Sequence, residues 1–167
     1  NSKESLKYFD SSKILTNTHE EYYKNYIISL IISGKVQKSI NIIKQNKNKN
    51  NFRLFETNLM LLIDNFKKGE FRQNIQLLNK FKSYRDYDNY NYIIYEVLKS
   101  YNDLFLKKEI NLNNKNFGKL SLINEAFQNC YLDLPKTDSK FLNLINSDDG
   151  DYTRYLFFHI NNLTLKK

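Results

Sequence analysis

The chain has 167 residues, of which 41% are hydrophobic, with one proline and four glycines, a composition that excludes global disorder and favours long helices over many short strands. Its single cysteine, Cys130, and its two histidines, His19 and His159, exclude an intramolecular disulfide and a four-ligand zinc site. The net charge is +8, and no apolar run approaches the ~18 residues that a membrane-spanning helix needs.

A repeat with a period near 34 residues organises the first half of the chain. Ser5, Ser39 and Asn74 align at spacings of 34 and 35 residues, and the apolar residues that follow each of them keep the same register. Gly34 and Gly69, also 35 apart, stand before the second and third segments. Because glycine tolerates positive φ, it ends a helix easily at such a position. We therefore expect pairs of helices joined by glycine turns.

Helical spacing of apolar residues extends through most of the chain. At the start of the first clear stretch, Thr18 and Glu21 form the pattern of a capping box. A helix pair alone leaves an apolar face uncovered, so stability must come from stacking neighbouring pairs. The stretches with this spacing are, in chain order, 23–31, 36–43, 54–66 (apolar nearly all round, as in a helix packed on two sides), 71–78, 90–105, 120–130, 141–145 and 152–163.

The pattern loosens in the second half. Gly118 follows Gly69 by 49 residues, which indicates either an expanded loop over the Asn-rich stretch 107–116 or a loss of register. Pro135 ends the helix before it, and Asp138 is a candidate cap for the short helix that follows.

We predict an all-α fold, an α-solenoid of antiparallel helix pairs with about seven to eight helices. The predicted organisation is a single segment over 1–167, with regular repeats over 1–83, an irregular pair with an extended loop over 84–135, and a short helix and the start of a further repeat over 136–167. Because the first residue is Asn1 and the last, Lys167, follows an apolar helical pattern, we expect a piece of a longer protein.

The first half of the chain resembles the tetratricopeptide repeat. Gly69-Glu70-Phe71 is similar to the family's Gly-Asp-Tyr turn, and Ser5 and Ser39 stand where the family prefers alanine. Asn74 departs from that pattern, as do Ile27 and Leu62, where the family prefers small residues. The resemblance covers roughly residues 1–83. It implies a superhelix whose first helices line a concave, partner-binding side.

A second stretch, from Phe117 to Phe158, resembles a group of tetratricopeptide proteins from AT-rich alphaproteobacterial genomes. The resemblance rests on residues 129–133 (Asn-Cys-Tyr-Leu-Asp) and 151–155 (Asp-Tyr-Thr-Arg-Tyr). Members of that group often look exported, and the resemblance implies a periplasmic or exported protein here. The residues themselves leave the compartment unknown.

Sequence motifs of catalysis are not found. The chain has no Gly-rich phosphate loop, no paired-His motif and no nucleophile elbow. Cys130 with His159 is a conceivable thiolate pair, but both lie in apolar helical patterns, and we favour core packing. The residues 148–151 (Asp-Asp-Gly-Asp) look like part of a calcium loop, although a solvated turn fits them better. We predict no enzyme activity, no metal and no cofactor.

Two surface features suggest other binding modes. A basic connector (Lys44, Lys47, Lys49 and Arg53) suits phosphate contacts or a soluble loop, and a tyrosine cluster (Tyr84, Tyr87, Tyr90, Tyr92 and Tyr95) suits a protein interface, base stacking or ordinary helix packing. Since AT-rich codons explain much of the excess of lysine and tyrosine, nucleic acid is the less favoured partner.

The predicted function is therefore a non-catalytic helical-repeat scaffold that binds a protein or peptide. The alternatives are a nucleic-acid-binding helical repeat that uses the basic connector and the tyrosines, and a helical regulatory arm of a larger enzyme. By the tetratricopeptide resemblance, the concave side comprises Glu21, Lys24, Ile28 and Ile32 from one repeat and Glu56, Leu59, Ile63 and Lys67 from the next. Its mixed apolar and charged character suits an extended peptide or a helix.

Overall fold

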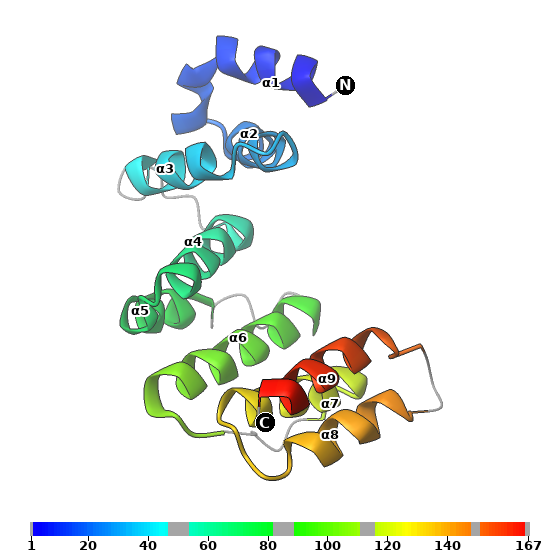
Figure 1. Cartoon of the computed structure of the whole chain (residues 1–167). Helices are drawn as coiled ribbons and strands as arrows, with labels where there is room; N and C mark the ends of the chain where they lie inside the picture. Colours follow the sequence, from blue (N-terminus) through cyan, green and yellow to red (C-terminus); the bar gives the residue numbers. More distant parts are fainter. Residues whose placement is uncertain (1, 47–53, 82–88, 111–115, 148–150, 166–167) are drawn as a thin grey trace. The chain divides into compact units, whose positions relative to one another are not determined.

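The structure, a computed structural model, describes residues 2–46, 54–81, 89–110, 116–147 and 151–165. Within these ranges it contains nine α-helices, one short 3-10 helix and no strand, so the predicted all-α class is confirmed. The predicted count was seven to eight helices, one fewer at least than the nine described; the segment with Ser5, which set the repeat register, forms the helix Ser2–Ser11. The helices, drawn in Figure 1, are α1 Ser2–Ser11, η1 Lys13–Asn17, α2 Glu20–Ile32, α3 Val36–Asn46, α4 Phe55–Lys68, α5 Phe71–Phe81, α6 Asn89–Lys107, α7 Lys119–Tyr131, α8 Thr137–Ile145 and α9 Arg154–Leu165.

The chain forms two compact units, which we call unit 1 (Asn1–Asn91) and unit 2 (Tyr92–Lys167). The boundary lies in the first turn of α6, so unit 1 contains α1 to α5 and unit 2 contains nearly all of α6 and α7 to α9. The predicted division at residues 83 and 135 stays a prediction.

Helices α2 and α4 end in the same hydrogen-bonded turn. Gly34 and Gly69 both have a φ of 74°. The backbone N–H of the next residue donates to the carbonyl five residues earlier, at 2.8 Å for Lys35 and 2.9 Å for Glu70. This is the Schellman motif, which satisfies carbonyls left unpaired at a helix end. A Cβ on either glycine would meet nothing within 4 Å, so positive φ alone favours glycine there. The predicted glycine turns are confirmed.

Two of the three residues that set the repeat register are buried, in α3 and α5, whereas Ser5 in α1 is exposed. Ser39 in α3 and Asn74 in α5 are fully buried. The Ser39 hydroxyl donates to the Val36 carbonyl at 2.7 Å, and Asn74 Oδ1 accepts from Asn65 Nδ2 of α4 at 3.0 Å. The asparagine is larger than the serine at the matching position, and its hydrogen bond to the facing helix offsets part of the cost of burying an amide.

Unit 1 is held together by packing between consecutive helices. Each of the pairs α1–α2, α2–α3, α3–α4 and α4–α5 is in contact, as is α2 with α4 (Figure 1). Leu6, Tyr26 and Leu30 form a buried cluster against which Phe9 and Ile42 pack. The α2–α4 contact brings together two helices that are not neighbours in sequence.

A buried carboxylate joins α3 to α4. Asp64 lies on the buried side of α4 and accepts hydrogen bonds from Lys44 Nζ at 2.8 Å and Lys68 Nζ at 2.7 Å. Burial raises the pKa of Asp64, but the hydrogen bonds and charges of the two lysines outweigh it and hold that pKa below its ordinary 3.8. Although α4 packs against neighbours on more than one side as predicted, it is less uniformly apolar than its sequence pattern suggested.

Unit 2 has its own core between α7, α8 and α9. Ala126, Phe141 and Leu144 are fully buried. The Phe127 ring packs edge-on against Phe141, with ring centroids 5.5 Å apart. Helix α8 contacts both α7 and α9, so the aromatic cluster is enclosed by three helices.

The turns of the second half depart from the glycine pattern. Gly118 has a φ of 61° but precedes α7, so it does not end a first helix. The residues with positive φ after α6 and α7 are Lys108 and Asp133. At Asp133 the Schellman hydrogen bond is present, from the N–H of Leu134 to the carbonyl of Asn129 at 3.0 Å. The same helix-ending turn thus occurs at the end of α7 without a glycine that would indicate it in the sequence.

Two predicted caps are wrong. Helix α2 begins after His19, and no side chain caps it. Thr18 closes η1 instead, with helical φ and ψ that are unsuited to an extended N-cap residue. Asp138 lies inside the first turn of α8 and accepts from Asn162 Nδ2 of α9 at 3.2 Å. In both cases a neighbouring element competes for the residue.

Candidate partner-binding surface

The seven residues predicted for the partner surface lie on α2 and α4 of unit 1. Helical geometry explains their position, because residues 21, 24 and 28 of α2 lie opposite the residues that α2 buries. The same holds for α4, whose residues 56, 59, 63 and 67 lie opposite its buried side. The buried residues are Tyr23, Tyr26, Ile27 and Leu30 in α2, and Thr57, Leu61, Leu62, Asp64 and Asn65 in α4.

An ion pair joins the two halves of this surface. Lys24 Nζ of α2 lies 3.1 Å from Glu56 Oε1 of α4. The hydrogen bond and charge of Glu56, with smaller contributions from Glu21 and Glu20, raise the pKa of Lys24. Three predicted residues, Glu21, Lys24 and Glu56, are therefore near one another in space. Because this pair is partly exposed, it orients the side chains more than it stabilises the fold.

The other predicted residues supply the apolar part. Ile28 and Leu59 are half-buried, and Ile63 is 48% exposed. Lys67 is exposed at the last turn of α4, and Ile32, at the end of α2, is 68% exposed. We define the α2–α4 surface as Glu21, Lys24, Ile28, Glu56, Leu59, Ile63 and Lys67.

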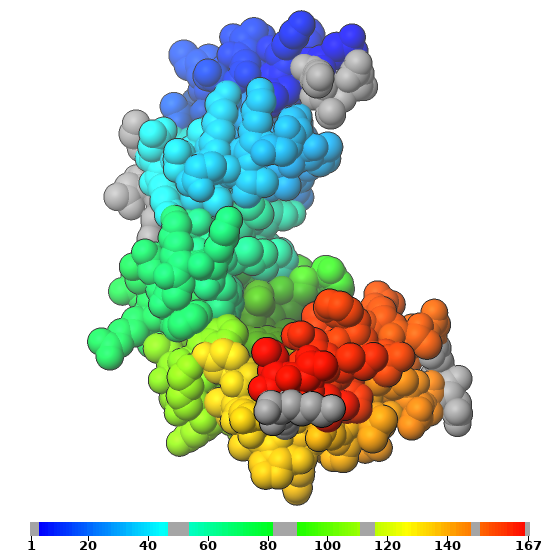
Figure 2. All heavy atoms as spheres, viewed as in Figure 1, coloured from blue at the N-terminus to red at the C-terminus, as the bar shows by residue number. Residues whose placement is uncertain are grey.

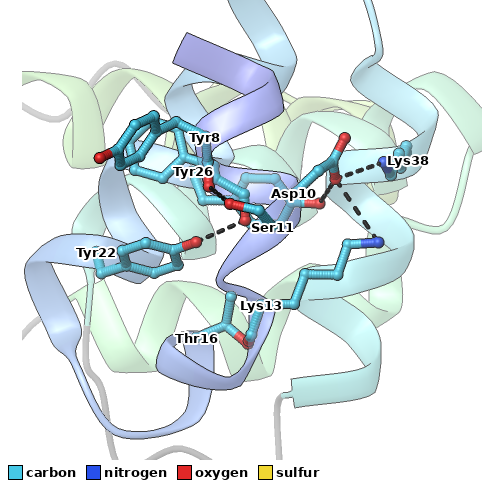
Figure 3. Close-up of polar contacts among 9 residues, drawn as sticks. Tyr8, Asp10, Ser11, Lys13, Thr16, Tyr22, Tyr26 and Lys38 are labelled. Carbon is cyan, nitrogen blue, oxygen red and sulfur yellow. Dashed lines mark hydrogen bonds and ion pairs between the residues drawn. The ribbon is translucent and has the colours of Figure 1, made fainter. Parts of the chain in front are cut away.

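A polar cluster on the other side of α2 ties α1, η1, α2 and α3 together (Figure 3). One oxygen of Asp10 accepts from the Tyr26 hydroxyl at 2.8 Å and from Lys38 Nζ at 3.2 Å, and it lies 3.6 Å from Lys13 Nζ. The hydrogen bond from Tyr26, with help from both lysines and against a desolvation cost, lowers the pKa of Asp10. A carboxylate held ionised in this way is a poor general base near neutral pH, so the cluster suits a structural role.

Sequence reasoning missed the Asp10 cluster. The available signal was an acidic residue in the last turn of a helix, where the dipole disfavours a negative charge and a compensating cation is needed. Tyr22 completes the arrangement by donating its hydroxyl to the Phe9 carbonyl at 2.5 Å, as Figure 3 shows beside the Asp10 contacts.

Cys130 and His159 belong to a polar chain inside unit 2. Cys130 Sγ lies 3.5 Å from Asn162 Oδ1, and Asn162 Nδ2 donates to Asp138 Oδ1. His159 is buried, stacks on Phe141 with centroids 5.8 Å apart, and has its Nε2 3.7 Å from Asp138 Oδ1. Cys130 Sγ therefore has a polar contact with the amide of Asn162. This contact is compatible with the core packing that we favoured.

The remaining candidate residues are placed only in part. Lys44 forms an ion pair with Asp64. Tyr95 is buried and Tyr90 is exposed. Asp151 accepts from the backbone and hydroxyl of Thr153 and so helps to start α9, and the hydroxyl bond is the largest cause of its lowered pKa. The predictions for Lys47, Lys49, Arg53, Tyr84, Tyr87, Asp148 and Asp149 lie outside the described residues.

Two features are absent from the described residues. No group of three or more His, Cys, Asp or Glu side chains there is close enough to hold a metal ion. In the same ranges, no helix has the length and apolar character needed to cross a membrane. Comparison with protein-family models, curated proteins and solved structures found no match.

Proposed function

We propose that the chain is a non-catalytic helical-repeat scaffold of the tetratricopeptide type that binds a protein or peptide on the α2–α4 surface. The observation that carries the proposal is the Lys24–Glu56 ion pair, which joins the same faces of two helices separated by α3. A repeat that stacks its first helices side by side requires this kind of contact. The matching turns at Gly34 and Gly69, 35 residues apart, support the same arrangement.

The composition of the surface supports a peptide ligand. Apolar area comes from Ile28, Leu59 and Ile63, and both signs of charge flank it. Peptide-binding helical grooves combine apolar contacts for affinity with charges that fix register. Since α2 and α4 are well packed on their other sides, the surface is preformed, which reduces the entropy lost on binding.

The distribution of charge supports a partner with acidic groups. Unit 1 has sixteen Lys and Arg against nine Asp and Glu, a net +7, whereas unit 2 has ten against nine, a net +1. Such a field accelerates encounter with an acidic ligand and weakens with salt. Nucleic acid shares this attraction; of the described members of its predicted site, Lys44 and Tyr95 are engaged in the fold, Tyr92 is half-buried and Tyr90 is exposed.

Peptide selection followed by titration tests the proposal. Peptides are selected from a displayed random library against the full chain, and their affinity is measured by fluorescence anisotropy. We expect Ile63→Asp to weaken binding at least about tenfold, because it places a charge in an apolar contact. The matched control is Ile75→Asp on α5, an isoleucine with 49% exposure against 48% for Ile63.

A charge-reversal variant tests the electrostatic part. Lys24→Glu with Lys67→Glu is expected to weaken the selected peptides without loss of helical circular dichroism. Equal affinity of Ile63→Asp, Ile75→Asp and the charge-reversed chain would refute the assignment of this surface. Tight binding of single-stranded RNA at low salt, lost in the charge-reversed chain, would favour the nucleic-acid alternative.

A further inference from the structure

The second helices of unit 1, α3 and α5, have an outer side that carries no carboxylate. Neither helix contains Asp or Glu, although the chain has 18 acidic residues, whereas α2 and α4 carry both signs of charge. Opposite their buried residues, both helices present amides, lysine or arginine. The exposed apolar residues of the two helices, Val36 and Ile75, lie outside this set. We call it the amide–cation face: Lys38, Asn41 and Lys44 of α3, and Arg72, Gln76 and Lys80 of α5.

The face has the same register in both helices. Residues 37, 41 and 45 of α3 match residues 72, 76 and 80 of α5 in the alignment that pairs Ser39 with Asn74. All six positions are exposed, and the spacing of four residues places each side chain ~6 Å along the helix axis from the next. In Figure 2, α3 in cyan and α5 in green both reach the surface at the left of unit 1. Each helix thus offers a continuous polar row to a ligand.

Arg72 is the member of the face that the fold does not account for. It lies in the first turn of α5, where the helix dipole disfavours a cation. It is exposed, and within the described part of the chain it forms no ion pair. A negatively charged ligand at this point would compensate both the side chain and the positive end of the helix.

Lys38 and Lys44 contribute to the fold and to the face at once. They bind the carboxylates of Asp10 and Asp64, but their side chains are still 41% and 45% exposed. An ammonium group has three hydrogens to donate, so each lysine retains donors for a ligand. Their charge is partly balanced by the carboxylates, and Arg72 and Lys80 of α5 are therefore the better residues to substitute in a test.

The chemistry of the face distinguishes between kinds of anionic ligand. A lipid surface is held by apolar side chains that insert into it, a peptide in a helical groove by apolar contacts, and a single-stranded nucleic acid by aromatic stacking. The six residues of the face supply none of these. Arginine, lysine, asparagine and glutamine are the side chains that bind the phosphates of a duplex, through hydrogen bonds and the release of counterions.

We propose that the amide–cation face binds the phosphate backbone of a double-stranded nucleic acid. Duplex DNA and duplex RNA share this backbone chemistry, and contacts to phosphates carry no sequence information, so the binding is independent of sequence. The inference goes beyond peptide binding, because no residue of the face belongs to the α2–α4 surface. Unit 1 would then hold a nucleic acid and a peptide on different helices.

Fluorescence anisotropy of labelled duplexes, titrated with the full chain, tests the proposal. DNA and RNA duplexes of one length, each in two unrelated sequences, show which backbone binds more tightly. The two sequences of a pair should bind alike. Because the face has four cations, the logarithm of the association constant should fall with the logarithm of the salt concentration, with a slope between about −2 and about −4.

Charge reversal on α5 locates the contact. Arg72→Glu with Lys80→Glu should weaken duplex binding at least about tenfold at about 100 mM salt. The matched control is Lys24→Glu with Lys67→Glu, which reverses the same number of positive charges in unit 1 but on the α2–α4 surface. It should weaken duplex binding by less than about threefold, because salt screens charges at a distance from the contact. Peptides selected on the α2–α4 surface should bind the α5 variant normally, so the two proposals fail independently.

A neutral variant measures the number of phosphate contacts without introducing negative charge. Arg72→Gln with Lys80→Gln should make the salt slope shallower by about 2, with helical circular dichroism unchanged. No binding of either duplex at about 50 mM salt would overturn the proposal, as would equal weakening by the two charge-reversed chains. Tighter binding of a single strand of the same length, of phosphatidylserine vesicles or of poly-glutamate would also overturn it, because each assigns the face to another kind of ligand.

Discussion

The buried carboxylate of Asp64 offers the sharpest test of how unit 1 is held together. Its side chain is only 3% exposed, and it binds Lys44 of α3 and Lys68 of α4 at 2.8 and 2.7 Å. Asp64→Asn keeps the shape of the side chain and removes its charge. The variant therefore isolates the electrostatic attachment of α3 to α4 from any change in packing.

The expected loss of unfolding free energy in Asp64→Asn lies between two limits. Breaking a fully buried ion pair costs about 3–5 kcal/mol, whereas exposed pairs contribute less than about 1 kcal/mol. Here the carboxylate is buried, but the lysine side chains are 45% and 41% exposed and regain water when it is neutralised. We expect Asp64→Asn to lower the unfolding free energy by about 2 kcal/mol at pH 7.

The pH dependence of the unfolding free energy shows whether the charge of Asp64 is responsible for the loss. Because folding lowers the pKa of Asp64 below 3.8, its stabilisation is complete above the unfolded-state pKa and is lost as pH falls through the folded-state pKa. Urea denaturation at pH 7, 5, 4 and 3 should therefore show the wild-type midpoint falling toward that of Asp64→Asn below about pH 4. Glu109→Gln, at an exposed acid, controls for the change in net charge. A difference at pH 7 that persists undiminished at pH 3, or no difference at pH 7, would refute this reasoning.

Three further predictions concern turns and buried hydrogen bonds. Gly69→Ala should lower the unfolding free energy by about 1 kcal/mol, because alanine is strained at a φ of 74°. Asp133→Gly should leave the unfolding free energy unchanged, and thermal denaturation measures both variants. Asn74→Ala and Asn65→Ala should each cost about 1–2 kcal/mol, and the double variant should cost less than their sum in a double-mutant cycle. Tyr26→Phe should raise the pKa of Asp10 toward its ordinary value, because the hydroxyl bond is the main cause of the lowering; carboxyl-carbon NMR titration measures it, and an unchanged pKa would contradict the assignment.

The two glycine turns of the first half were predictable because such turns have a strict local requirement. A Schellman turn needs a positive φ, and glycine meets it at the smallest cost, so Gly34 and Gly69 mark the helix ends in the sequence. The position five residues later is buried in both second helices, as the alignment of Ser39 with Asn74 indicated. In the second half Lys108 and Asp133 occupy positive φ, and a sequence offers no comparable signal for them.

The faces of α2 and α4 were also predictable, because helical period alone separates a buried side from an outer side. The residues that cap the helices were not predictable. Thr18 matches a capping pattern, but η1 occupies the chain before α2 and fixes its backbone in a helical conformation. Whether a polar residue caps a helix depends on which neighbouring element engages it, and this competition is not visible in local sequence.

By itself, the sequence determined the helical class, the 35-residue spacing of the two glycine turns and the outer faces of α2 and α4, since these depend on composition, on φ and on the helical period. The tertiary structure alone decided the partners of the charged and polar side chains. Asp10 meets Tyr26 and Lys38, and Lys24 meets Glu56, across 16 to 32 residues of chain. The same packing placed two polar residues of α9 in the interior, because His159 stacks on Phe141 and Asn162 bonds to α7 and α8.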